Sequence, residues 1–163
     1  MISRIYAIDP GCEQSALVVW DGQRIIEHEI YANADMLMRL TRHESSALLL
    51  IEQVASYGMA VGAEVFETVF WSGRFAQTWI DEGPGEWQRM KRLEVKMALC
   101  HDSRAKDANV RQAVLDLFGS TRQRAIGTKK QPGPLYGISG DEWSALALVM
   151  TYLSVNNLSV RSA

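Results

Sequence analysis

The sequence predicts an α/β fold in which a mixed five-stranded sheet is flanked by helices. Alternating strand-like segments open the chain, a continuous apolar run fills residues 47–54, and helical periodicity covers residues 63–80 and 106–118. The chain has 163 residues, of which 47% are hydrophobic, enough to bury one core but too few for two ordinary domains. We therefore expect a single domain over residues 1–163.

The first three strands are expected to form an antiparallel meander. Residues 4–8 alternate and are rich in residues that favour strands, and they end at the turn sequence Asp9-Pro10-Gly11. Residues 15–20 and 24–31 follow, and the Asp21-Gly22 pair between them is typical of a hairpin turn.

The middle of the chain predicts a helix, a buried strand and a longer helix. Residues 34–42 have apolar side chains at helical spacing, and the run at residues 47–54 suits a strand covered on both faces. Residues 63–80 carry an apolar stripe at helical spacing and are followed by Gly83-Pro84-Gly85, which ends a helix.

The last third of the chain is expected to contain a fifth strand and two helices. Residues 92–99 alternate and are assigned to the strand, and residues 106–118 are assigned to an amphipathic helix. Residues 120–138 contain glycines, lysines and a Pro-Gly-Pro cluster, so we expect a mobile basic loop. Ser139 is the expected N-cap of a final helix over residues 141–153.

Charge is distributed unevenly along the chain. The formal net charge is −2, but residues 89–130 hold eleven basic and four acidic residues. A basic stretch in an acidic chain suits a nucleic-acid partner, because affinity for nucleic acid depends on local phosphate contacts. The alternative is an ordinary solvated helix face.

Cysteine content and hydropathy indicate in which cellular compartment the protein is expected. Cysteine occurs only as Cys12 and Cys100, and no signal-peptide pattern opens the chain, so a reducing cytoplasm is expected. Cys100 and His101 have no matching pair elsewhere in the sequence, which argues against a zinc site. No apolar run approaches the roughly 20 residues of a membrane span, so no membrane partner is expected.

Three carboxylates stand where an expected strand ends or an expected helix begins: Asp9, Glu52 and Asp141. Glu52 is the most informative, because a carboxylate at the end of a buried strand needs a cation or a metal ion beside it. Carboxylate clusters without His or Cys suit Mg²⁺ or Mn²⁺, and two such ions promote in-line hydrolysis of a phosphodiester. Taken singly, the same residues fit a β-turn, a salt bridge and a helix cap.

The order of these residues, with the motifs around them, resembles the RuvC-type Holliday junction resolvases over almost the whole chain. The matching segments are Ile8-Asp9-Pro10-Gly11 with Ser15, Ile51-Glu52-Gln53-Val54, Gly73-Arg74, Val95-Lys96, Lys106, and Asp141 with Ser144-Ala145-Leu146-Ala147. The Ile-Glu-Gln-Val run and the Ala-Leu-Ala helix are the most specific of them. Short loops and the tryptophans Trp71 and Trp79 resemble the phage-encoded branch more than the bacterial one.

The resemblance implies an RNase H-like fold, a homodimer, and paired nicking of four-way or otherwise branched DNA without a nucleotide cofactor. It also implies Mg²⁺, or Mn²⁺ in its place, with two ions per active site. Asp9, Glu52 and Asp141 would be the metal ligands, and Lys96 would be a catalytic cation near the scissile phosphate. The expected DNA-binding residues are Lys96, Lys106, Arg74, Arg104, Lys129 and Lys130.

The sequence departs from the family pattern at one metal-ligand position. The family's last motif has two Asp residues three positions apart, and Ser144 stands at the second of these positions here. Glu142 points about 100° away from Asp141 around a helix, which makes it a poor geometric substitute. The fourth ligand is therefore open between Ser144, Glu142 and water.

An apolar stripe on the expected long helix, Val65, Phe66, Val69 and Phe70, is the expected dimer interface. Stacking of Phe66, Phe70 and Trp71 on unpaired bases is the alternative use of these aromatic side chains.

Other functions fit the same residues. One is a nuclease of this fold that acts on forks, flaps or RNA/DNA hybrids, and another is a catalytically silent junction-binding protein. A kinase-like ATPase domain also uses an Asp-Gly phosphate turn, but the short chain lacks a second glycine-rich phosphate loop.

Overall fold

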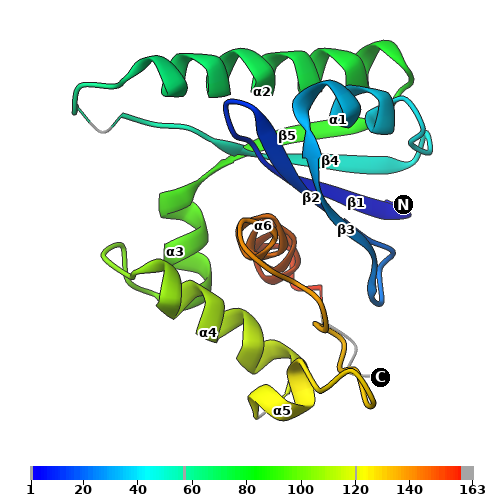
Figure 1. Cartoon of the computed structure of the whole chain (residues 1–163), viewed down its shortest axis with the longest axis vertical. Helices are drawn as coiled ribbons and strands as arrows, with labels where there is room; N and C mark the ends of the chain where they lie inside the picture. Colours follow the sequence, from blue (N-terminus) through cyan, green and yellow to red (C-terminus); the bar gives the residue numbers. More distant parts are fainter. Residues whose placement is uncertain (1, 57, 120, 159–163) are drawn as a thin grey trace.

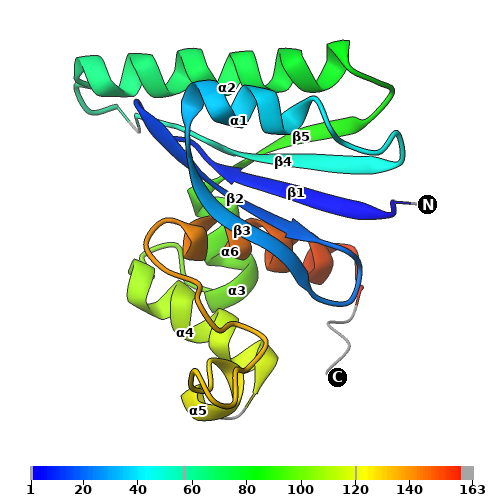
Figure 2. The same ribbon diagram turned by 45° about the vertical axis from the view of Figure 1, so that its right-hand side comes forward.

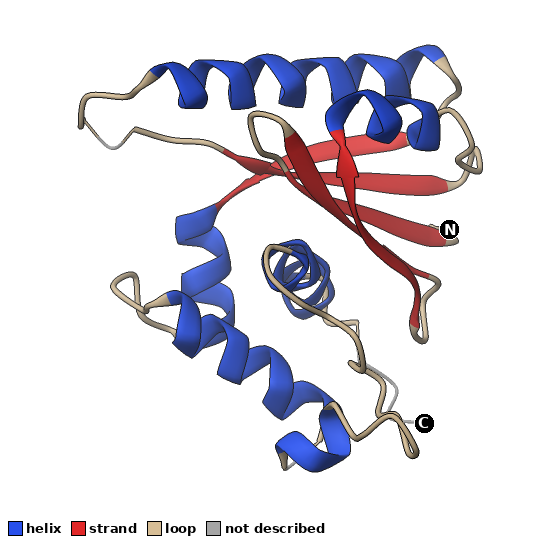
Figure 3. Ribbon diagram, viewed as in Figure 1, coloured by secondary structure: helices blue, strands red, loops and turns tan. Residues whose placement is uncertain are grey.

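A mixed five-stranded sheet lies at the centre of the computed structural model, which describes residues 2–56, 58–119 and 121–158. The strand order is β3-β2-β1-β4-β5, with helices on both sides (Figure 1; Figure 3). The strands are β1 (Arg4–Asp9), β2 (Gln14–Trp20), β3 (Ile25–Ala32), β4 (Ala47–Gln53) and β5 (Glu86–Lys91). The fold class predicted from the sequence is confirmed.

Two layers of helices enclose the sheet (Figure 2). α1 and α2 cover one face, and α6 packs on the other face with α3 and α4 outside it. The helices are α1 (Asn33–Leu40), α2 (Ala63–Asp81), α3 (Arg92–Cys100), α4 (Asp107–Phe118), α5 (Arg122–Ala125) and α6 (Glu142–Val155). None of the helices in the described part of the chain combines the length and the apolar character that crossing a bilayer requires.

Strand direction brings the carboxyl ends of three strands to one edge of the sheet. β1, β2 and β3 pair antiparallel, as the predicted meander requires, whereas β4 pairs parallel with both β1 and β5. Ile8 lies opposite Ile51, and Glu52 lies opposite Met90. Residues that end or follow β1, β4 and β5 are therefore neighbours, as at other sites of parallel sheets.

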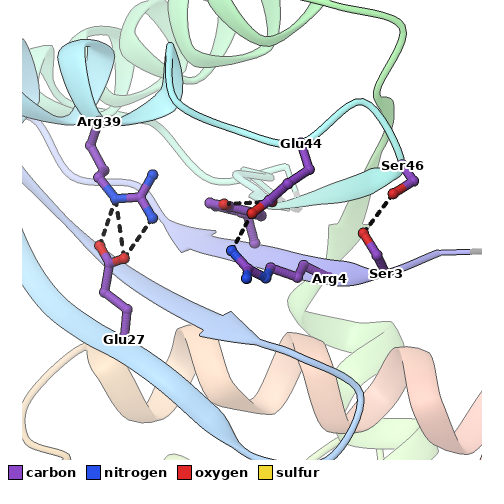
Figure 4. Close-up of polar contacts among 7 residues, drawn as sticks. Ser3, Arg4, Glu27, Arg39, Glu44 and Ser46 are labelled. Carbon is purple, nitrogen blue, oxygen red and sulfur yellow. Dashed lines mark hydrogen bonds and ion pairs between the residues drawn. The ribbon is translucent and has the colours of Figure 1, made fainter.

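The layer of α1 and α2 is held by an apolar core and by ion pairs at its margin. Tyr6 and Ile8 of β1 and Trp79 of α2 are fully buried in this core. Arg39 of α1 donates from Nε at 2.8 Å and from Nη2 at 2.5 Å to the Glu27 carboxylate of β3 (Figure 4). This two-pronged contact fixes α1 against the antiparallel part of the sheet.

α6 is apolar on all sides because it is enclosed on all sides. Residues 145–150 are buried, with Ala7 of the sheet in the same core as Val95 of α3 and Val114 of α4. A helix surrounded in this way is positioned by packing rather than by its own amphipathic pattern. Asp141 directly precedes α6, so its backbone is placed by the same packing.

The strand predicted at residues 92–99 is wrong: these residues form α3, and the fifth strand is the preceding segment, β5. The apolar alternation was misleading, because Val95 is the one residue of α3 that is fully buried. Glu94 accepts the Lys91 N–H at 2.5 Å and so satisfies a backbone donor at the helix start. β5 carries a weak signal because it is an edge strand with one buried side chain, Met90.

The loop expected at residues 120–138 is only partly confirmed: most of the described segment is irregular, but it contains one short helix, and Ser120 lies outside the described residues. The segment contains α5, and Gly127 pairs with Pro132 in a short bridge. Leu135 is fully buried in the core around α6. This apolar anchor, together with backbone hydrogen bonds, gives the segment a defined path.

Ser139 is not the N-cap of α6, although the predicted helix itself is confirmed. Asp141 occupies the cap position and makes no side-chain cap hydrogen bond. The Ser139 N–H and hydroxyl instead donate to the Glu142 carboxylate at 2.6 and 3.2 Å. The acidic side chain of the first turn thus caps the backbone that leads into the helix.

A buried polar ring supports the turn that follows Asp9. The Ser15 hydroxyl donates to Asn33 Oδ1 at 2.6 Å, and Asn33 Nδ2 donates to the Gly11 carbonyl at 3.0 Å. The Gly11 N–H closes the ring by donating to Ser15 Oγ at 3.1 Å. Because Ser15 and Asn33 are buried, these hydrogen bonds fix the path of the turn.

Replacing Asn33 with alanine is expected to lower the free energy of unfolding by about 1–3 kcal/mol, because its buried partners would lose their hydrogen bonds. Urea unfolding measures this change. Gln112→Ala is the matched control, because the Gln112 amide also donates a hydrogen bond, to Asp116 at 2.8 Å, but on the exposed surface of α4. Its loss should cost less than about 0.5 kcal/mol. Equal stability of the two variants would contradict the role of the ring.

Candidate active site

The sheet edge brings together the three carboxylates that the sequence singled out. Asp9 is the last residue of β1, Glu52 lies one residue before the end of β4, and Asp141 immediately precedes α6. The charges of Glu52 and Asp141 both act on Asp9, so the three side chains share one electrostatic environment. α6 packs against β1, which brings Asp141 from the far end of the chain to this edge.

The electrostatics of the cluster are dominated by buried negative charge. Burial, followed by the charges of Glu52 and Asp141, raises the pKa of Asp9 from 3.8 to about 7. A hydrogen bond from Ser144 and the charge of Arg92 act in the opposite direction without cancelling the rise. The cluster therefore holds more negative charge than its surroundings neutralise.

The donor chemistry of this cluster fits a hard divalent cation. Asp9, Glu52 and Asp141 offer only oxygen ligands, which Mg²⁺ and Mn²⁺ prefer. Within the residues that the structure describes, no three acidic, His or Cys side chains already stand close enough to enclose an ion. Buried like charges repel one another, and a bound divalent cation would relieve both the repulsion and the raised pKa of Asp9.

Ser144 and Glu142, the two side chains considered for the fourth ligand, have different partners. The Ser144 side chain lies near Asp9, whose pKa it lowers. Glu142 is buried, with His28 Nδ1 at 2.9 Å from its carboxylate and the Ser139 N–H donating to it at 2.6 Å. Ser144 thus contacts the acidic cluster, whereas the Glu142 carboxylate is engaged elsewhere.

Two cations stand beside the cluster at the start of α3. Arg92 Nη1 lies 3.4 Å from Glu52 Oε2, and Arg92 Nη2 donates to Asp107 Oδ1 at 2.7 Å. Burial raises the pKa of Glu52, and the charges of Arg92 and of Lys96, one turn further along α3, act against this rise.

Arg92 is the site residue that the sequence analysis missed. Arg92 is one of the basic residues of the segment 89–130, but a strand over residues 92–99 does not predict that its side chain lies beside Glu52. The signal that could have found it is the strand order. A helix that begins at the carboxyl end of a strand parallel to β4 places its first residue beside Glu52.

The other predicted DNA-binding residues of the basic segment are exposed. Lys106 immediately precedes α4, and Arg104 lies in the loop before it. Lys129 and Lys130 form the tip of a tight turn that backbone hydrogen bonds close. Among the described residues, no hydrogen bond or ion pair joins these four side chains to the three carboxylates.

The predicted apolar stripe of α2 is exposed in the single chain. Phe66, Val69 and Phe70 expose 65%, 51% and 60% of their surface. Arg74, the remaining predicted DNA-binding residue, lies over the Trp71 ring, with 4.3 Å between its guanidinium carbon and the ring centroid. Contiguous exposed apolar side chains of this kind are typical of a contact surface.

Solved structures of RuvC from Thermus thermophilus share this fold. One has a TM-score of 0.66 and 17% sequence identity, and the match covers 94% of this chain and 95% of that one. Another, in complex with a Holliday junction substrate, has a TM-score of 0.65 and 16% identity and covers 96% and 98%. No protein-family model matches the chain, and no curated protein matches its sequence. The RuvC-type fold that the sequence motifs predict is confirmed.

Asp9 gives the metal-free protein a defined pH dependence of stability. Its folded-state pKa of about 7 exceeds the ordinary 3.8, so between these values the folded chain keeps a proton that the unfolded chain releases. This contribution is complete at low pH and is lost as the pH rises toward 7. Asp9→Asn removes the titrating group, so its stability relative to the wild type should rise over the same pH range.

The expected gain is at most about 1.4 kcal/mol per pH unit between about pH 4 and pH 7, with a plateau above. Urea unfolding of both proteins in EDTA, at steps of one pH unit, measures it. A stability difference that does not change with pH would show that the Asp9 carboxyl titrates normally.

Proposed function

We propose that this protein is a divalent-metal-dependent endonuclease that resolves four-way DNA junctions. The observation that carries the proposal is the meeting of Asp9, Glu52 and Asp141 at one edge of a RuvC-type fold, with charge that the protein alone does not neutralise. A junction is the substrate in one of the similar structures, which favours branched over linear DNA.

The proposed cofactor is Mg²⁺, or Mn²⁺ in its place, with two ions per active site held by Asp9, Glu52 and Asp141. When bound, such ions activate water and offset the charge that develops on a phosphodiester during in-line hydrolysis. Lys96, whose charge acts on Glu52, would hold the scissile phosphate by charge. The Ser144 hydroxyl, which lies near Asp9, would help to stabilise the charged form of its carboxylate.

The basic segment is proposed to bind the DNA backbone. It runs through α3, α4 and α5, which lie together on the side of the sheet that carries α6 (Figure 1). Its exposed lysines and arginines can approach phosphates without breaking any contact to the acidic cluster. The proposed DNA-binding residues of this segment are Lys96, Lys106, Arg104, Lys129 and Lys130, and Arg74 of α2, on the other face of the sheet, is proposed in addition.

Glu52→Gln is expected to abolish cleavage and to leave junction binding within about threefold of the wild type, because it removes a metal ligand but no phosphate-binding cation. Cleavage of a synthetic four-way junction in Mg²⁺, compared with a linear duplex of the same sequence, measures activity. Ca²⁺ should support binding but little cleavage, since its coordination is longer and looser.

Glu29→Gln is the matched control, because Glu29 is exposed on the edge strand β3 and the substitution changes charge equally. It should cleave at the wild-type rate. Junction binding by the wild type without cleavage in any divalent ion would identify a silent binding protein instead. Faster cleavage of flaps or RNA/DNA hybrids than of junctions would assign a different substrate.

A homodimer is proposed, because a junction has two strands to cut and each chain carries one acidic cluster. Phe70→Asp, which places a charge on the exposed stripe of α2, should yield monomers in sedimentation at micromolar concentration. Met38→Asp, on an exposed position of α1, is the control and should leave the dimer intact. A wild type that is monomeric and still resolves junctions would contradict the proposal.

A further inference from the structure

A hollow of about 440 Å³ is lined by Arg92, Leu93, Lys96 and Ser103, and Arg92 connects it to Glu52 of the acidic cluster. Two of these four side chains are cations, and a third carries a hydroxyl. The hollow lies against α3, whose first residue is Arg92, so the positive end of the helix dipole adds to its field. An anionic backbone therefore has both room and attraction at this point.

The two contacts of the Arg92 guanidinium are unequal. The hydrogen bond to Asp107 is short, at 2.7 Å, whereas the approach to Glu52 is long, at 3.4 Å. A guanidinium carries five N–H donors in a planar fork, so these two contacts leave most of its donors unused. Asp107 therefore holds the group in place, and the side toward Glu52 stays available for another acceptor.

The Arg92–Asp107 ion pair joins a half-buried cation to an exposed carboxylate. The Arg92 side chain is 20% exposed and the Asp107 side chain is 81% exposed, so solvent weakens the contribution of the pair to folding. Asp107 opens α4, while Arg92 opens α3, so the pair joins the starts of these two helices next to Glu52. The pair orients a cation toward Glu52, one of the three carboxylates of the acidic cluster, which is the placement that a phosphate-binding group of the proposed nuclease requires.

We propose, on the basis of the nuclease function above, that Arg92 is a catalytic residue that donates hydrogen bonds to the phosphate being cut, and that Asp107 is the positioning residue that aims it. Once Glu52 serves a metal ion, the Nη1 side of the guanidinium is free for a non-bridging phosphate oxygen. Charge-assisted donors placed in advance in this way act on charge that develops in the transition state.

The test measures single-turnover cleavage of a four-way junction in Mg²⁺ and, separately, junction affinity by fluorescence anisotropy in EDTA. Arg92→Ala should lower the cleavage rate by about 10²–10³-fold, because one transition-state donor is lost, and change affinity by less than about threefold. Arg92→Lys should recover part of the rate, since it restores the charge but not the planar fork. Asp107→Asn should lower the rate by about tenfold at unchanged affinity.

The double variant separates positioning from an independent effect. If Asp107 acts through Arg92, Asp107→Asn should cost nothing further in the Arg92→Ala background. Independent, multiplying losses would overturn the positioning role. An equal loss of affinity and rate in Arg92→Ala would make Arg92 an ordinary backbone contact and overturn the catalytic role.

Arg42→Ala is the charge-matched control, because Arg42 is exposed just after α1 on the other side of the sheet. It should cleave at the wild-type rate. If Arg92→Ala fails to fold by circular dichroism, Arg92→Lys and Asp107→Asn decide the question. A wild type that cuts no DNA overturns the nuclease function and this inference together, whereas an active wild type matched by Arg92→Lys and Asp107→Asn overturns this inference alone.

Discussion

The parallel pairing of β1 with β4 is the constraint on which the rest of the site depends. Because the two strands run in the same direction with Ile8 opposite Ile51, Asp9 and Glu52 emerge at one edge of the sheet. β5 continues the parallel arrangement and delivers Arg92 to the same edge. The antiparallel meander on the other side of β1 supplies no such convergence, since its strands alternate in direction.

Bringing the three carboxylates together at a partly buried position disfavours their charged forms. Burial, followed by the charges of Glu52 and Asp141, raises the pKa of Asp9 to about 7, and Ser144 and Arg92 offset only part of the rise. A protein that places uncompensated charge at a sheet edge favours the binding of cations there. The basic side chains of α3, Arg92 and Lys96, act on Glu52 of the acidic cluster and offset only part of the effect of its burial.

The helices on the two faces of the sheet are buried to different extents. α6 is enclosed between the sheet and the α3–α4 layer, which gives Asp141 and Ser144 a rigid support, and Glu142 adds a buried polar brace to His28. α2 is packed along one side only and leaves Phe66 and Phe70 in solvent. The acidic cluster is thus supported by the side with the deeper core, whereas α2 presents exposed apolar side chains on the other side.

The local sequence pattern by itself determined several elements of the fold: the antiparallel meander, the long helix α2, and the helices α4 and α6. It also identified Asp9, Glu52 and Asp141 as candidate metal ligands. Hydrophobic periodicity and turn residues act over a few positions, so they can be read without the fold. The tertiary structure alone decided that residues 92–99 form a helix, because an edge strand such as β5 buries one side chain and leaves almost no pattern. The tertiary structure also decided that Arg92 lies between Glu52 and Asp107 and that Leu135 anchors residues 121–138 in the core around α6. These contacts join segments far apart in the chain, so the spacing of residues in the sequence cannot predict them.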